Sequence, residues 1–172
     1  MIERRDLSGS TDYDAVIETP VDDIHLAIAT SRNRLLAVDF VDRLVAIRPS
    51  ITPFGRRVVT ELTAYFTDPS HRFELPTLDS GTEFQRRVWQ RLKTIPAGKT
   101  LCYGDLAEKL GSAARAVGGA CRANRIPIII PCHRIVSRQG IGGYCGEPDN
   151  GHQGRMLAFK EWLLRHEQII PA

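Results

Sequence analysis

The sequence predicts an α+β protein, in which a small N-terminal domain with an antiparallel sheet and a helix precedes a mostly helical C-terminal domain containing a helix-turn-helix. Strand-like segments are confined largely to the first third of the chain, and helical spacing of apolar residues dominates after residue 82. A polar stretch with Pro76 and Gly81 separates the two regions. We therefore assign residues 1–78 to an N-terminal α/β scaffold domain and residues 79–172 to the C-terminal domain.

The N-terminal region is expected to form three strands and one helix. His25–Thr30 and Leu35–Val41 are interpreted as an antiparallel hairpin joined through Ser31–Arg34. Tyr13–Glu18 is rich in β-branched residues and is a candidate third strand. Phe54–Phe66 carries apolar residues at helical spacing, which predicts a helix after the hairpin.

Two helices are expected to frame the C-terminal region. Thr82 followed by Gln85 is a capping box, and apolar residues then recur at helical spacing until Pro96-Ala97-Gly98 ends the helix. Phe159–Glu167 is predicted to be a terminal helix. The loop before it, Gly140–Gly154, is long for a compact domain, which indicates function or mobility.

Two shorter helices are expected between them. Gly104–Leu110 is predicted to be one, and Ser112 can cap another from Ala113 to about Arg122. The tight turn at Gly111 makes the pair similar to a helix-turn-helix.

The second of these short helices has glycines and arginines on one side. Arg115, Gly118, Gly119 and Arg122 share that side of the helical wheel. A glycine inside a helix lowers the stability of the helix by up to about 1 kcal/mol relative to alanine, so we expect a specific reason for its presence. One reason is close approach of the helix backbone to another molecule. The alternative is tight packing against a neighbouring helix, which leaves the arginines unexplained.

A thiol and an imidazole are adjacent at Cys132 and His133. The preceding Ile126–Ile130 is interpreted as a buried strand or extended segment. An unassisted thiol has a pKa of roughly 8.5, so a nucleophilic cysteine needs a base or a positive charge nearby, which His133, Arg134 and Arg125 could supply. Cys132 and His133 can cooperate only if Pro131 starts a turn. The alternative is a buried cysteine that acts as a small hydrophobic residue.

The charge of the chain is unevenly distributed. Residues 1–78 carry 12 acidic and 9 basic residues, whereas residues 79–172 carry 8 acidic and 14 basic residues. Between Glu108 and Glu147 there are basic residues but no carboxylate. A surface of that sign favours a polyanion, and nucleic acid is the usual one. A solvated basic face with no partner is the alternative.

The four cysteines are expected to stay reduced, and their spacing does not favour a metal site. Their spacings, with 18, 10 and 12 intervening residues, contain no close pair of the kind that zinc sites use. The sequence shows no secretory signal and no apolar run long enough to cross a bilayer. We expect a cytoplasmic protein without metal, cofactor or membrane association, acting as a monomer.

These features resemble the O6-alkylguanine-DNA alkyltransferases, also called methylated-DNA–protein-cysteine methyltransferases, over nearly the whole chain. Asn124 lies eight residues before the cysteine of Pro131-Cys132-His133-Arg134, and that combination is a highly specific signature. The other matching motifs are Thr82-Glu83-Phe84-Gln85, Val88-Trp89, Ile95-Pro96-Ala97-Gly98, Tyr103-Gly104, Arg115-Ala116-Val117-Gly118, Gly143-Tyr144, Lys160-Glu161-Trp162-Leu163-Leu164 and Glu167.

The resemblance implies DNA repair by direct reversal of damage. The Cys132 thiolate would take the alkyl group from O6 of a guanine flipped out of duplex DNA, irreversibly and once per molecule, with O4-alkylthymine as a further candidate substrate. His133, acting through a water and oriented by Glu167, would draw the thiol proton. Asn124 would hold the active-site turn, and Tyr103 would donate to the departing base.

The resemblance also implies a DNA interface and a substrate pocket. Arg115 would fill the gap left by the flipped nucleotide, while its helix lies in the minor groove. The other DNA-binding residues implied are Ala114, Ala116, Gly118, Gly119 and Arg122. The residues implied for the substrate pocket are Pro127, Tyr144, Cys145 and Lys160. The partner would be double-stranded DNA containing alkylated guanine.

The chain departs from the family pattern at three places. The turn at Gly111–Arg115 is shorter than usual and lacks a proline, Cys145 stands where a small residue or serine is frequent, and extra residues occur from Pro148 to Arg155.

Two other functions remain as alternatives. One is a sensor that binds alkylated guanine without transfer, although such relatives lack the reactive cysteine. The other is a thiol hydrolase, although those usually bring their histidine from a distant part of the sequence.

Overall fold

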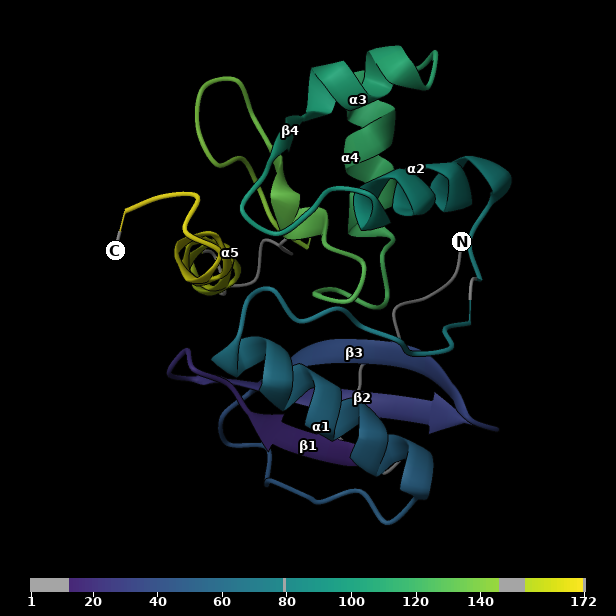
Figure 1. Cartoon of the computed structure of the whole chain (residues 1–172), viewed down its shortest axis with the longest axis vertical. Coiled ribbons are helices and arrows are strands. Elements are labelled where there is room, and N and C mark those ends of the chain that lie inside the picture. The colour runs from purple at the N-terminus through teal and green to yellow at the C-terminus, as the bar shows by residue number, and fades with distance from the viewer. Residues whose placement is uncertain (1–12, 79, 146–153, 172) are drawn as a thin grey trace.

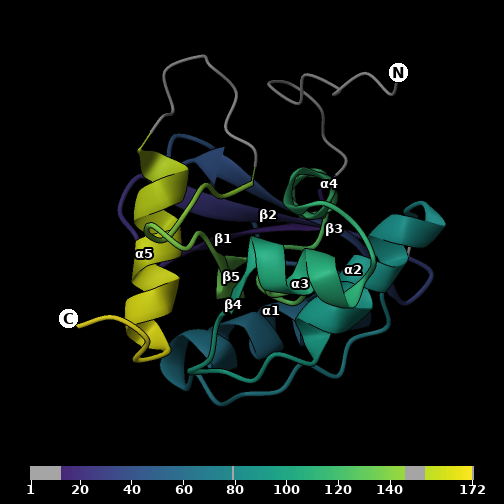
Figure 2. The same cartoon turned by 90° about the horizontal axis from the view of Figure 1, so that it is seen from above.

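The computed structural model describes residues 13–78, 80–145 and 154–171. A three-stranded sheet with helix α1 against it forms the lower part of the molecule, and helices α2 to α5 lie beyond strand β3 (Figure 1). Seen from above, α5 and α2 lie on opposite sides of α3 (Figure 2). One continuous cluster of buried apolar residues extends from the sheet to α5. The mixed α and β composition predicted from the sequence is confirmed.

The sheet consists of β1 (Ala15–Glu18), β2 (Ile24–Ser31) and β3 (Arg34–Asp42), paired antiparallel in that order. Arg32 and Asn33 take left-handed backbone angles, with φ of 46° and 61°, which suit a two-residue hairpin turn. The predicted hairpin and the candidate third strand are therefore confirmed.

Helix α1 (Pro53–Thr67) begins with a capped turn, because the side chain of Thr52 accepts a hydrogen bond from the backbone N–H of Gly55. Val58, Leu62 and Tyr65 point inward and are completely buried. The predicted helix is confirmed within one residue at each end, and its inward face brings Tyr65 into the centre of the molecule.

Helix α2 (Glu83–Lys93) has the predicted capping box, in which Thr82 and Gln85 exchange side-chain to backbone hydrogen bonds. The helix ends at Lys93, one turn before the proline and glycine that were expected to stop it. Trp89 donates from Nε1 to the carbonyl of Ala120 at 2.9 Å. That bond fixes α2 against the helix that carries the two glycines.

Helices α3 (Tyr103–Lys109) and α4 (Ala114–Arg122) are the two predicted short helices. The predicted cap at Ser112 is wrong, since Ala113 occupies the capping position of α4 and no side chain caps it. Ser112 instead donates its backbone N–H to the carbonyl of Ala107 and so still belongs to the end of α3.

The segment Ile126–Ile130 is buried, as predicted, but it is not extended. The backbone N–H of Ile130 bonds to the carbonyl of Ile126 at 2.9 Å, and Ile128 has a φ of 73°. The apolar run is therefore a compact buried turn, and the predicted strand is wrong. Periodicity cannot distinguish a buried strand from another buried segment of this length.

A second, very small sheet lies close to the thiol. Strand β4 (Leu101–Cys102) runs parallel to β5 (Ile135–Val136). Helix α5 (Arg155–His166) closes the chain and begins one turn before the predicted start. Much of the long loop expected before it, residues 146–153, lies outside the described residues. None of the described helices has both the length and the apolar character of a membrane span.

Candidate active site

The thiol and the imidazole lie on a single 3-10 turn, η1 (Cys132–Arg134), that follows Pro131. Cys132 donates its backbone N–H to Ile130 at 2.7 Å, and Arg134 donates to Pro131 at 3.0 Å. The turn at Pro131 that cooperation between Cys132 and His133 requires is present. Because the backbone turns here, the side chains of Cys132 and His133 both face the interior, where each is buried.

The Cys132 sulfur is held by polar side chains in an otherwise apolar setting. Asn124 donates from Nδ2 to the sulfur at 3.3 Å and to the carbonyl of Ile130 at 2.9 Å. A hydrogen bond from Cys145 lowers the pKa of the Cys132 thiol against the effect of burial, and Asn124 and the charge of Lys160 act in the same direction. The site therefore favours the thiolate, which is the nucleophilic form.

His133 and Glu167 form a completely buried pair. The distance from His133 Nε2 to Glu167 Oε1 is 2.9 Å, and neither side chain reaches solvent. Burial raises the pKa of Glu167, but hydrogen bonds from His133 and Arg134 outweigh it and hold that pKa at about 2. An ionised carboxylate can only accept, so we assign the imidazole proton to Nε2. Nδ1 has no partner among the described residues and is left as the acceptor.

His133 is neutral before any reaction, because burial lowers its pKa although Glu167 opposes that effect. A neutral imidazole with one free nitrogen can take a proton from a neighbouring acid. The paired carboxylate would then stabilise the imidazolium that forms. The turn thus combines a candidate nucleophile with a candidate general base.

Two side chains from outside the turn shape its surroundings. Tyr103, at the start of α3, donates its hydroxyl to the carbonyl of Gly143 at 3.4 Å, and burial raises its pKa, so the phenol keeps its proton. Lys160 is completely buried on α5 and donates to the carbonyls of Ile135 at 2.7 Å and Gly143 at 3.0 Å. Burial lowers the pKa of Lys160 to about 8. Both residues fix the backbone just before Cys145.

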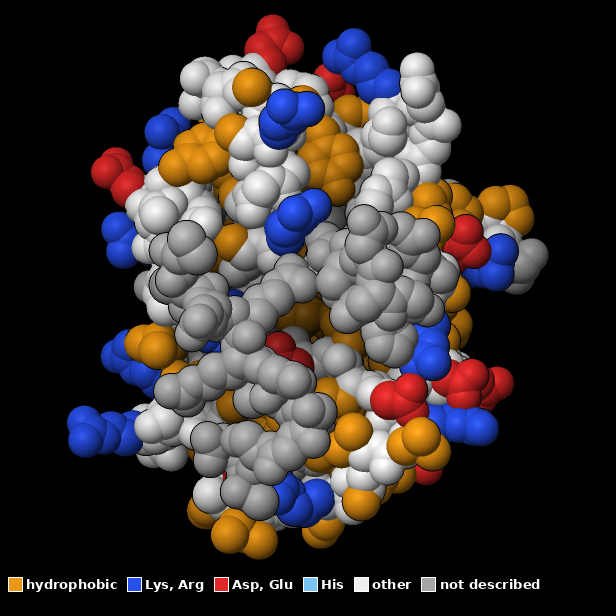
Figure 3. Space-filling model, turned by 180° about the vertical axis from the view of Figure 1, so that it is seen from behind, with side chains coloured by type: hydrophobic (Ala, Val, Ile, Leu, Met, Phe, Trp, Pro, Cys, Tyr) orange, Lys and Arg blue, Asp and Glu red, His pale blue; other side chains and the backbone are white. Residues whose placement is uncertain are grey.

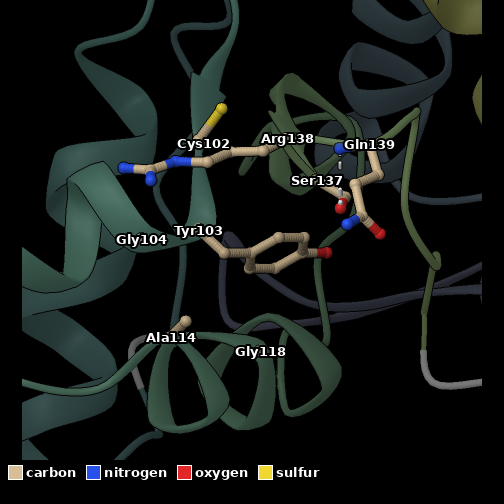
Figure 4. Close-up of a pocket in the computed structure, with 8 residues that line it drawn as sticks. All are labelled: Cys102, Tyr103, Gly104, Ala114, Gly118, Ser137, Arg138 and Gln139. Carbon is tan, nitrogen blue, oxygen red and sulfur yellow. Dashed lines mark hydrogen bonds between the residues drawn. The ribbon is translucent and has the colours of Figure 1, made fainter.

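Two cavities open beside α4. One, of about 770 Å³, is lined by Tyr103, Arg115, Gly118, Gly119, Cys121, Arg122, Gly142, Gly143, Tyr144, Cys145 and Leu157. The other, of about 650 Å³, lies between α4, the start of α3 and the segment after β5. Figure 4 shows the ring of Tyr103 extending across this second cavity above Ala114 and Gly118. Tyr103 and Gly118 line both cavities.

The outer face of α4 is exposed and built from small and basic residues. Val117, Ala120 and Cys121 are buried, whereas the opposite face is open; its exposed residues are Ala114, Arg115, Ala116, Gly119 and Arg122. A methyl group added at Gly119 would meet no atom of the described residues within 4 Å. Packing among those residues therefore does not require that glycine. Figure 3 shows basic side chains across the same end of the molecule, with hydrophobic side chains between them.

The family model for the DNA binding domain of 6-O-methylguanine DNA methyltransferase matches residues 83–169, half of the chain. The chain belongs to the 6-O-methylguanine DNA methyltransferase family. Every site residue predicted from the sequence lies within the matched range.

Similar proteins are found among the methyltransferases of bacteria. A methylated-DNA–protein-cysteine methyltransferase of Shigella flexneri is 51% identical over 99 residues, which are 56% of this chain and 53% of that protein. The chain thus aligns with about half the length of this enteric relative. The constitutive methylated-DNA–protein-cysteine methyltransferase of Bacillus subtilis is 35% identical over 165 residues, covering 91% of this chain and 96% of the relative.

Solved structures of the methyltransferase family have the same fold. The crystal structure of Mycobacterium tuberculosis O6-methylguanine methyltransferase superposes with a TM-score of 0.69 at 31% identity, covering 91% of this chain and 93% of that one. A crystal structure of Mycobacterium tuberculosis OGT in complex with DNA has a TM-score of 0.67 at 32% identity, covering 89% and 91%.

The site residues predicted from the sequence lie at different depths. Asn124 contacts Cys132 and Glu167 contacts His133, so that two side-chain pairs meet at one turn, and Tyr144 and Cys145 line the larger cavity. Cys132, Lys160 and Pro127 are not among the described residues that line either cavity. Pro127 is buried in the turn before Cys132. The thiol thus lies behind the cavity wall.

Sequence reasoning missed one member of the site, Tyr65. Its hydroxyl donates to Glu167 Oε1 at 2.8 Å, although 102 positions separate the two residues. In the sequence Tyr65 looks like an ordinary inward residue of α1. The only signal is general: a buried tyrosine hydroxyl needs a partner. Arg134 also contributes more than charge, because it contacts both carboxylate oxygens of Glu167 at 2.8–3.2 Å.

Proposed function

We propose that the chain repairs alkylated DNA by moving the alkyl group from O6 of a guanine in duplex DNA to the sulfur of Cys132. The observation that carries this proposal is the buried turn of Cys132 and His133 with its partners Asn124 and Glu167, which combines a thiol of lowered pKa with a neutral imidazole. Relatives that share 35–51% identity carry the name methylated-DNA–protein-cysteine methyltransferase, and this supports the same assignment.

The reaction forms one bond and breaks one. His133 accepts the thiol proton at Nδ1, directly or through a water, and Glu167 stabilises the resulting imidazolium. The thiolate electron pair forms the new S–C bond, while the C–O6 electron pair remains on guanine. The raised pKa of Tyr103 keeps its phenol protonated, so the phenol donates a hydrogen bond to the departing base. The released guanine then takes its proton from water. The product is a thioether, which the site has no group to cleave, so each molecule acts once.

The exposed face of α4 is proposed to bind the minor groove. With α3 it would form a helix-turn-helix in which small residues permit close approach to the sugar-phosphate backbone. The open space at Gly119 supports this role, because no contact in the described part of the chain explains the glycine. Arg115 would occupy the stack in place of the flipped nucleotide, which offsets part of the unstacking cost of a few kcal/mol.

We also propose a domain organisation, a monomeric state, a set of pocket residues and a second substrate. We place the boundary between an N-terminal scaffold domain and a C-terminal DNA-binding and alkyl-transfer domain at residues 78 and 79, and we expect a monomer. Tyr144, Cys145, Lys160 and Pro127 are proposed to shape the pocket. O4-alkylthymine is a further candidate substrate.

Stoichiometry tests the proposed function. The protein is mixed with excess duplex DNA containing O6-methylguanine, and restored guanine is measured after digestion of the DNA to nucleosides. The expected result is a plateau at one guanine restored for each protein molecule, and none with Cys132→Ser. Tight binding of the modified duplex without restored guanine would instead favour a sensor, and turnover beyond one equivalent would exclude a self-inactivating transfer.

A further inference from the structure

The hydroxyl of Tyr65 and the imidazole of His133 share one oxygen atom of Glu167. This oxygen, Oε1, lies 2.8 Å from the Tyr65 hydroxyl, 2.9 Å from His133 Nε2 and 2.8 Å from Nη2 of Arg134. The second oxygen, Oε2, accepts from Nε of Arg134 at 3.0 Å and from the backbone N–H of Gly98 at 3.4 Å. The tyrosine and the candidate base thus compete for the same acceptor atom.

Three close donors exceed the acceptor capacity of this oxygen. A carboxylate offers about four lone-pair sites over its two oxygens, so each oxygen has about two. With three donors within 2.9 Å of Oε1, each donor interacts with a smaller share of the charge than it would alone. Removal of one donor should therefore strengthen the bonds from the other two, including the bond from His133.

Tyr65 is held firmly in this position by α1 and α5. It is completely buried, and its ring packs edge-on against His166 with the ring centroids 5.4 Å apart. Its backbone carbonyl lies 2.7 Å from His166 Nε2. Burial raises the pKa of Tyr65 and the neighbouring Glu167 raises it further, so the phenol keeps its proton and remains a donor. The N-terminal helix α1 therefore supplies a fixed donor to a site whose thiol and imidazole lie on η1.

We propose that Tyr65 is a positioning residue for alkyl transfer, whose hydroxyl takes up part of the charge of Glu167 Oε1 and so keeps the imidazole of His133 neutral until it accepts the thiol proton. This inference rests on the proposed function of Cys132 and His133. The N-terminal region would then contribute to the chemistry as well as to the scaffold.

The charged groups that act on His133 come from the elements around its turn. Burial lowers the pKa of His133, Glu167 opposes that effect, and the charges of Arg134 on η1 and Lys160 on α5 lower it further. The buried residues of α2, which also packs against η1, are uncharged. Loss of the Tyr65 hydroxyl would leave more of the Glu167 charge to His133, and we expect the pKa of His133 to rise by about one unit.

Proton magnetic resonance of the variant Tyr65→Phe tests this inference without DNA. The Nε2 proton of His133 resonates further downfield as its bond to Glu167 strengthens, and its signal is the one that His133→Gln removes. Tyr13→Phe is the matched control, because it removes a hydroxyl that donates to a different carboxylate, that of Asp39, at 3.2 Å. Val58→Ala, on the same buried face of α1, is the control for lost packing. Sucrose in every sample keeps destabilised variants folded.

The expected result is a downfield shift of the Nε2 proton in Tyr65→Phe and little change in the two controls. A tyrosine that only fills space would leave a looser pair of His133 and Glu167 when its hydroxyl is removed. An upfield shift, an unmoved signal or loss of the signal through exchange with water would therefore overturn the proposal.

The pH dependence of benzyl transfer from free benzylated guanine gives a second readout. Below both titration midpoints the neutral fraction of His133 should fall by up to about tenfold in Tyr65→Phe, and its rate should fall relative to that of the wild type. Above both midpoints the ratio of the two rates should be one or higher. A ratio equal at pH 5 and pH 8 would overturn the proposal. If the wild type transfers no benzyl group, the proposed function fails, and the spectrum still decides whether Tyr65 acts on His133.

Discussion

The substitution Glu167→Gln is expected to lower the free energy of unfolding by about 3 kcal/mol at pH 7. The Glu167 side chain is completely buried and accepts hydrogen bonds from His133, Arg134 and Tyr65. Its pKa is about 2, against an ordinary value of 4.5. Each pKa unit corresponds to about 1.4 kcal/mol, so the difference converts to about 3 kcal/mol. This agrees with the roughly 3–5 kcal/mol lost when one partner of a buried ion pair is removed.

The pH dependence of this loss has a definite sign. The folded-state pKa of Glu167 is depressed, so its stabilisation is complete above the unfolded pKa and is lost as the pH falls toward about 2. Glutamine does not titrate. The difference in unfolding free energy between wild type and variant should therefore be full above about pH 5 and fall to about half by pH 3.

Urea unfolding followed by circular dichroism, at a series of pH values, measures this difference directly. Glu161→Gln is the matched control on α5, because Glu161 is well exposed and pairs with Arg165 at 4.0 Å, so its loss should stay below about 1 kcal/mol. A loss under about 1 kcal/mol for Glu167→Gln at pH 7, or one equal at pH 5 and pH 3, would refute the reasoning. Methyl transfer should also slow at least tenfold, since His133 loses the carboxylate that stabilises its charge.

Three further substitutions test separate parts of the account. Tyr65→Phe should lower the free energy of unfolding by about 1.5–3 kcal/mol, measured by urea unfolding, because it removes one hydrogen bond to a buried carboxylate. Gly119→Ala should leave stability unchanged or raise it by up to about 1 kcal/mol, yet weaken duplex binding in a fluorescence anisotropy titration; unaltered binding would contradict a minor-groove role. Arg115→Ala should slow repair of duplex DNA more than reaction with free benzylated guanine. Equal losses on both substrates would show that Arg115 does not take the place of the flipped nucleotide.

Local signals in the sequence predicted much of the fold. The capping box at Thr82 and Gln85 needs only residues three positions apart, and it is present as expected. The hairpin and the turn at Pro131 depend likewise on neighbouring residues. The pairing of His133 with Glu167 was available only through family resemblance, because 34 positions separate them.

Contacts distant in sequence account for what sequence reasoning missed. Tyr65 looks like a core aromatic until α1 brings its hydroxyl to Glu167. The strands β4 and β5 are two residues long, too short for any periodic pattern. The run Ile126–Ile130 is equally apolar as a strand or as a buried turn, and only the structure distinguishes them. The near-complete burial of Cys132 also has no signal in the sequence.

Peptide mapping by mass spectrometry tests the central claim most directly. The protein is mixed with duplex DNA containing O6-methylguanine and digested with trypsin, and the peptide 126–134 is fragmented to locate any added group. We predict one methyl group on the sulfur of Cys132, and none on the peptide that carries Cys145. A methyl group on any other residue, or an unmodified Cys132 in folded protein that binds the duplex, would contradict the account.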